Sequence, residues 1–187
     1  MADDLTYSFK SYPTTTKTEE IRFYVWGGRL RVGVRKTESR ETICEFIISG
    51  EKKRLVRQTI EQILKASPGQ ARPIHLKKWN VEKKEWTIVA VLQFVKDPTN
   101  VYKIQMKYNG TTYESNVRGP ADVDLGSEPM SNAQRSTIGL ESLLDYLVET
   151  VPYQEVLTNK KREFPGGGNS APSIPRTVVN DDNGELF

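Results

Sequence analysis

Arginine side chains alternate with aromatic rings along one stretch of the chain, between Ile21 and Arg35. Two alternating runs flank Gly27-Gly28, and a two-residue glycine loop is typical of tight antiparallel hairpins, because mirror-type turns need positive φ. Successive side chains of a strand point to opposite faces. One face of the predicted hairpin is therefore apolar, and the opposite face carries Arg22, Tyr24, Trp26, Arg29, Arg31 and Arg35.

Guanidinium groups interleaved with rings match the chemistry of single-stranded nucleic acid. The positive charges can follow the phosphates while the rings stack on bases. The alternative is an ordinary solvated strand face whose aromatic residues are incidental. Four arginines beside Tyr24 and Trp26 on one hairpin favour nucleic-acid binding. Further candidates for the same surface come from a later part of the chain and are Lys77, Trp79, Lys103 and Lys107.

The sequence offers no recognisable catalytic or metal-binding set. His75 is the only histidine and Cys44 the only cysteine, so no pair at metal-ligand spacing and no internal disulfide can form. The glycine pairs do not precede a helix in the manner of a phosphate-binding loop. Asp122, Asp124 and Glu128 cluster in a Pro- and Gly-containing stretch, where solvated acidity is the ordinary explanation. We expect no enzymatic activity, no metal and no cofactor.

Charge is distributed unevenly along the 187 residues. Residues 165–187 hold one arginine and three carboxylates, a net charge of −2, so the overall +3 leaves +5 for the rest of the chain. A basic body indicates a polyanionic partner, and an acidic end indicates a separate role. No apolar run approaches the roughly 20 residues that span a bilayer. The start lacks a secretory layout and one cysteine suits a reducing compartment, so we expect a cytoplasmic protein, in the host cytoplasm if it is from a phage.

Turn signals and hydrophobic periodicity predict the elements that position the basic face. Two strands of the hairpin and a third at 41–48 precede a helix that Ser49 caps and that runs to about Ala66. A second round has strands at 73–79, 84–95, 101–108 and 111–117. It closes with a helix from about Thr137 to Val151 that stops at Pro152. This order predicts an α+β fold with antiparallel sheets in two sheet-then-helix units.

The two units are predicted to form one domain, because each half alone has few core residues, although two separate small sheets are an open alternative. The apolar stripes of both helices, and a strand at 87–95 that is apolar on both faces, predict a homo-oligomer unless an intramolecular core covers them. We expect a flexible arm at 1–18, with at most a short edge strand, and a nucleic-acid-binding domain at 19–158 whose units span about 19–67 and 72–152. A basic Gly/Pro-rich linker at 159–180 and an acidic tip at 181–187 follow.

The run FYVWGGRLRVGVRKT, followed by a third strand and an amphipathic helix, resembles the core of the positive-cofactor-four and Whirly proteins. Whirly proteins also carry two successive sheet-then-helix units in one chain. The resemblance covers about residues 20–150, with matching residues in the first unit alone. It implies single-stranded nucleic-acid binding across the sheet edges and oligomerisation through the helices. Whirly units have four strands, whereas the first unit here shows three unless the stretch near Tyr7 to Tyr12 supplies one.

The last residues resemble the C-termini of bacterial and phage single-stranded DNA-binding proteins, which end in acidic residues and a terminal Phe after a Gly/Pro-rich linker. The matching residues are Asp181, Asp182, Glu185, Leu186 and Phe187. We expect this tail to be disordered and to bind partner proteins.

Together the two resemblances predict a single-stranded DNA-binding protein of a phage or bacterium. It would coat or protect single strands in replication or recombination and recruit partners through the tail. The alternatives are a transcription regulator or an RNA-binding protein on the same fold and, third, a protein-interaction module whose basic face docks an acidic partner.

Overall fold

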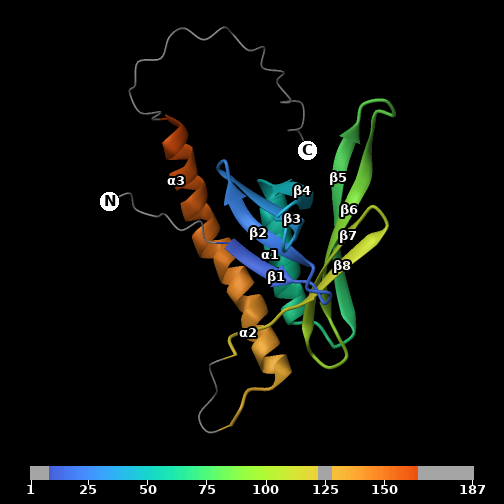
Figure 1. The fold of residues 1–187 in the computed structure, drawn as a ribbon, viewed down its shortest axis with the longest axis vertical. Coiled ribbons are helices and arrows are strands. Elements are labelled where there is room, and N and C mark those ends of the chain that lie inside the picture. Colours follow the sequence, from blue (N-terminus) through green and yellow to red (C-terminus); the bar gives the residue numbers. More distant parts are fainter. Residues whose placement is uncertain (1–8, 122–127, 164–187) are drawn as a thin grey trace.

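The computed structural model describes residues 9–121 and 128–163, which form two sheets and a set of helices (Figure 1). The fold is α+β, with two sheet-then-helix units, as predicted. The helices are α1 (Glu51–Leu64), α2 (Asn132–Asp145), the π-helical η1 (Tyr146–Thr150) and α3 (Val151–Glu163). The strands are β1 (Phe9–Pro13), β2 (Glu19–Trp26), β3 (Arg29–Lys36), β4 (Thr42–Ile48), β5 (Gln70–Asn80), β6 (Glu85–Lys96), β7 (Tyr102–Tyr108) and β8 (Thr111–Asn116).

Each sheet is a four-stranded antiparallel meander, in the orders β1-β2-β3-β4 and β5-β6-β7-β8. The fourth strand of the first sheet is β1, in which Phe9 pairs with Tyr24 and Pro13 pairs with Glu20. Tyr12 of β1 is buried with its ring edge against Phe23, at a centroid distance of 6.2 Å. Residues 9–13 therefore belong to the sheet and not to a flexible arm.

The two units share one hydrophobic core. Inward-facing side chains of both sheets and of α1, α2 and η1 join a single buried cluster. The sheets also meet at their edges, where the Thr15 amide donates to the Glu114 carbonyl at 2.8 Å and Ser115 Oγ donates to the Pro13 carbonyl at 2.6 Å. These contacts hold the β1 and β8 edges together.

The predicted cap of α1 is wrong by one residue. The N-cap is Gly50 rather than Ser49, and no side chain caps the helix. Gly50 has a φ of 51°, in the left-handed region that glycine enters without steric cost. Val56, Ile60 and Ile63 of the apolar stripe of α1 are buried, whereas Leu55, which has the same helical spacing in the sequence, is exposed.

The second helix begins earlier than predicted, at Asn132. Ser131 is its N-cap and forms a capping box with Gln134, since Ser131 Oγ accepts from the Gln134 amide at 3.2 Å and Gln134 Oε1 accepts from the Ser131 amide at 2.8 Å. This pattern is readable in the sequence as Ser-x-x-Gln before an apolar run. The predicted start near Thr137 did not take it into account.

Pro152 does not end this helix, because a π-helical turn comes just before it. Proline lacks an N–H group, and its ring clashes with the carbonyl group four residues earlier in a regular α-helix. In η1 the Val151 amide donates to the Tyr146 carbonyl, five residues back, and the chain continues as α3 to Glu163. Residues 159–163, expected at the start of the linker, are therefore helical.

Several predicted features lie outside the described residues. They are most of the linker, the acidic tip at 181–187, the start of the N-terminal arm, and Asp122 and Asp124. In the part of the chain that is described, no helix is both long and apolar enough to cross a membrane.

Candidate nucleic-acid interface

The β2–β3 hairpin has the turn and the two faces that its sequence predicts. Gly27 and Gly28 have φ values of 61° and 75°, so both occupy the positive-φ region that a mirror-type turn requires. Trp26 and Arg29 pair directly across this turn. The inward-facing side chains are all buried and are Ile21, Phe23, Val25, Leu30, Val32 and Val34.

All six basic and aromatic residues predicted on the hairpin lie on its opposite side. The register of the four strands extends this side across the whole first sheet. We call it the outer face, and its members are Phe9, Ser11, Glu20, Arg22, Tyr24, Trp26, Arg29, Arg31, Gly33, Arg35, Glu45 and Ile47.

One carboxylate organises the end of the outer face that is farthest from the hairpin turn. Glu20 accepts from Arg35 through Nε and Nη2, each at 2.6 Å, and Arg22 Nε lies 3.6 Å from the same oxygen. Ser11 Oγ donates to the other oxygen. Burial disfavours the charged form of Glu20, but the hydrogen bonds from Ser11 and Arg35 outweigh it and lower the pKa of the carboxyl.

A second carboxylate holds the middle of the outer face. Glu45 of β4 accepts from the Tyr24 hydroxyl and from Arg31 Nη1. Burial raises the pKa of the Glu45 carboxyl, against the effect of the Arg31 guanidinium, which favours the charged form. Sequence reasoning missed both Glu20 and Glu45, because their role depends on cross-strand register. The alternation of side chains along 41–48 places Glu45 on the side opposite Cys44, and this pattern could have predicted Glu45 on the outer face.

Arg22 is packed against aromatic rings. Its Cζ atom lies 4.0 Å from the centroid of the Phe9 ring and 5.4 Å from that of Tyr24. Guanidinium groups are attracted to ring faces, so these contacts fix the side chain in place. Phe9 was not among the predicted residues, because β1 was not assigned with certainty from its sequence.

The tip of the hairpin is more open than the rest of the outer face. Trp26 is 57% exposed, and Arg29 opposite it is exposed too. Among the side chains that the structure describes, Arg29 has no carboxylate at ion-pair distance. A ring and a cation are thus presented to solvent side by side.

The four candidates from the second unit share a face of the second sheet. His75 pairs with Val91, and a register shift follows between Leu76 and Lys77. Lys77 and Trp79 keep the alternation of β5 itself, because they are exposed like His75 whereas Ile74 and Leu76 are buried. Lys107 pairs with Val91 and Lys103 with Val95, and both therefore lie on this side. Lys103 is held by Glu114 at 3.1 Å.

The β5–β6 hairpin extends beyond the rest of its sheet (Figure 1). Pairing of β6 with β7 ends at Ala90 opposite Tyr108, so the distal part of the hairpin pairs only with itself. Near its tip the rings of Trp79 and Trp86 meet edge to face, with centroids 5.6 Å apart, and they are 41% and 50% exposed. Trp86, which pairs with Trp79, was not among the predicted site residues.

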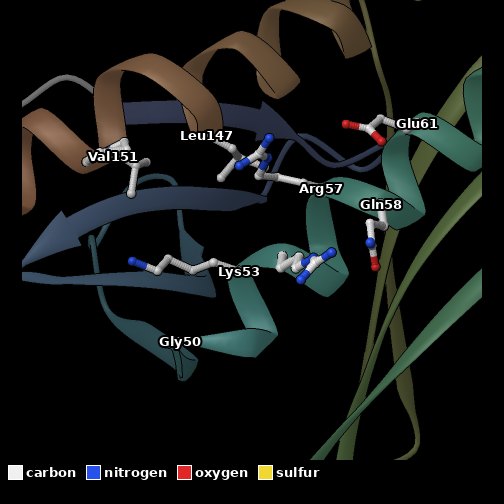
Figure 2. A pocket seen from close by; sticks show the side chains of 9 residues that line it. Gly50, Lys53, Arg57, Gln58, Glu61, Leu147 and Val151 are labelled. Carbon is white, nitrogen blue, oxygen red and sulfur yellow. The ribbon is translucent and has the colours of Figure 1, made fainter.

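A basic pocket of about 370 Å³ lies elsewhere, between α1 and the η1–α3 helix (Figure 2). Lys53, Arg54 and Arg57 line it together with Leu147 and Val151. Lys53 donates to Glu155 at 2.6 Å, and Glu155 also accepts from the Leu30 amide at 3.2 Å. These bonds tie α3 to α1 and β3, and the pocket contains none of the predicted binding residues.

The described residues contain no group of three or more His, Cys, Asp or Glu side chains placed to hold a metal ion. Cys44 is buried, and burial raises the pKa of its thiol.

Comparison with known proteins does not assign this chain to a family. No protein-family model matches the sequence, and no curated protein matches it either. A chain of a solved structure described as trypanosoma bruciei MRP1/MRP2 is similar with a TM-score of 0.40 and 9% sequence identity, over 85% of this chain and 88% of that chain. A likeness of this size does not establish a shared fold.

Proposed function

We propose that this protein binds single-stranded DNA on the outer face of its first sheet. The observation that carries the proposal is the alignment of four arginines with the rings of Tyr24 and Trp26 on one side of a single hairpin. Cations that follow phosphates, next to rings that stack on bases, hold single strands with little sequence preference. The side of the second sheet that bears Lys77, Trp79, Lys103 and Lys107 is a further surface for the same strand.

The internal bonds of the outer face support binding rather than oppose it. Glu20 and Glu45 hold Arg35, Arg31 and Tyr24 in defined positions, so less side-chain entropy is lost when a strand binds. Trp26 and Arg29 are the exposed members at the hairpin tip and provide the first contact with a strand. Duplex DNA hides its bases in the stack, so rings on a sheet have little to engage there.

The biological role that fits this activity is coating or protecting single strands during replication or recombination, in a phage or bacterium. In this role Asp181, Asp182, Glu185, Leu186 and Phe187 act as a peptide ligand for partner proteins. The three carboxylates meet a basic rim, while the Phe187 ring fills an apolar pocket. Within the chain, the same peptide competes with DNA for the arginines.

Deletion of residues 181–187 tests the role of the tail. The expected result is unchanged or tighter single-strand binding, most clearly at low salt, together with loss of binding to replication proteins. Weaker DNA binding or a less stable fold in the truncated protein would show that the tail belongs to the body instead.

Replacement of both outer-face rings distinguishes strand binding from docking of an acidic protein. A Tyr24→Leu/Trp26→Leu variant keeps every positive charge and removes the stacking surfaces. We expect its affinity for single strands to fall, whereas docking through charge would survive. Fluorescence anisotropy with a labelled oligonucleotide measures the change, and circular dichroism checks that the variant is folded. An unchanged affinity would refute the stacking mechanism.

A further inference from the structure

The outer face contains a hollow beside Gly33. A pocket of about 210 Å³ opens there, and its lining includes Arg22, Tyr24, Arg35, Arg40 and Thr42. Gly33 creates the hollow because it has no side chain in a row where Arg31 and Arg35 are its neighbours. The strands are also unusually close at this point, since a Cβ atom on Gly33 would overlap the Cys44 carbonyl oxygen and lie 3.2 Å from the Glu45 Cα atom.

Positive charge exceeds negative charge around this pocket. Three guanidinium groups line it, and Glu20 is the carboxylate that pairs with two of them, Arg22 and Arg35. No carboxylate of the described chain lies at ion-pair distance from Arg40. The pKa of Arg22 is lowered by burial and then by the charges of Arg35 and Arg40. The three cations are therefore close enough to repel one another, and an anion would relieve that repulsion.

The turn between β3 and β4 holds Arg40 at the rim. Arg40 has a φ of 57°, in the left-handed region that most residues avoid. The turn is closed by a hydrogen bond from the Lys36 amide to the Glu41 carbonyl at 2.9 Å and by an ion pair between their side chains at 2.7 Å. Arg40 was not among the predicted binding residues, because no local pattern indicates that this turn lies beside Arg22.

We propose that this hollow is a phosphate site, which takes one phosphate of the bound strand between Arg22, Arg35 and Arg40. The inference rests on the proposed function and adds a defined anchor point to it. Guanidinium forks bind phosphate oxygens in bidentate fashion. The fork of Arg35 already holds Glu20, whereas Arg40 forms no ion pair with a described carboxylate and can offer both arms of its fork, and Thr42 lines the same wall. With a phosphate seated here, the next base lies beside the Tyr24 ring, which lines the same pocket.

An Arg40→Ala variant tests the site through strand binding. Arg40 is exposed and outside the core, so the fold should survive. We expect affinity for a single strand to fall about tenfold, and the slope of log affinity against log salt to shrink by about 0.7, the value for one phosphate contact. The matched control is Arg54→Ala on α1, which removes the same charge at an exposed position outside this pocket. Equal losses in the two variants, or no loss in Arg40→Ala, would overturn the proposal.

Phosphate itself tests the site independently of strand binding. In ¹H–¹⁵N spectra, titration with inorganic phosphate or thymidine 5′-monophosphate should shift the Gly33 amide signal in the wild type and leave it in place in Arg40→Ala. Thymidine without phosphate should leave it in place in both. Absence of a wild-type shift, or the same shift in the variant, counts against the pocket. If the protein binds phosphate but not single strands, the proposed function is wrong and the phosphate site is supported. If it binds single strands but not phosphate, the proposed function is supported and the phosphate site is wrong.

Discussion

Trp26 is the residue on which stacking depends most, because its ring is the most exposed aromatic ring of the outer face, at 57%. Truncation to alanine should weaken single-strand binding by about 1–3 kcal/mol, the usual contribution of one stacked base. Tyr153→Ala on α3 is the control, since it removes an exposed ring that is not part of the outer face. Fluorescence anisotropy titrations measure the affinity of both variants for a labelled single strand. Equal affinities for Trp26→Ala and the wild type would show that no base stacks on this ring.

Glu20 makes the stability of the outer face depend on pH. Its pKa is lower in the folded chain than in the unfolded chain, so the unfolded chain takes up the proton more readily. The stabilising effect of Glu20 is present above the ordinary glutamate pKa of 4.5 and is lost as pH falls through the lowered value. Urea unfolding between about pH 6 and about pH 3 should therefore show a steeper loss of stability in the wild type than in Glu20→Gln. Identical pH profiles would contradict this role.

At the scale of strands and helices, the close approach of β3 and β4 leaves no room for a side chain at residue 33. Gly33→Ala should lower the free energy of unfolding by about 1–3 kcal/mol, the usual cost of forcing extra volume into a packed site. Chemical denaturation measures the change. A variant as stable as the wild type would mean that the two strands separate easily, and the hollow beside Gly33 would then not be a fixed feature.

The same scale shows which elements the sequence could predict. The β2–β3 hairpin was predictable in full because its glycine turn and its alternation of residues are local signals. The β1 strand was left uncertain because five residues next to a threonine-rich stretch carry little pattern, and the β2 edge stabilises them. Pro152 was misread as a stop, since no local pattern reveals the π-helical turn before it, where Leu147 and Val151 pack in the core. Arg40 and Glu45 join the site through register and turn geometry, which no local pattern reveals.

At the scale of the whole molecule, the helices expose less apolar surface for an oligomer interface than their sequence pattern predicts. Most of the stripe residues are buried within the chain, and the large apolar side chains that stay exposed on the helices include Leu55, Ile138 and Val148. We still expect a homo-oligomer through these helices. Light scattering should give a multiple of 21.3 kDa, and Val148→Lys should lower the mass while Glu149→Lys, at the neighbouring exposed position, should not. A mass of 21.3 kDa for the wild type in dilute solution would rule the oligomer out.

The most direct test of the central claim is the affinity of the full chain for single-stranded DNA, single-stranded RNA and duplex DNA of equal length, measured at several salt concentrations. The account predicts tighter binding to single strands than to duplex, DNA ahead of RNA, and a log–log salt slope of about −0.7 for each phosphate that the basic side chains neutralise. A preference for RNA would favour the RNA-binding alternative on the same surface. Equal binding to duplex, or an affinity that does not change with salt, would contradict the account.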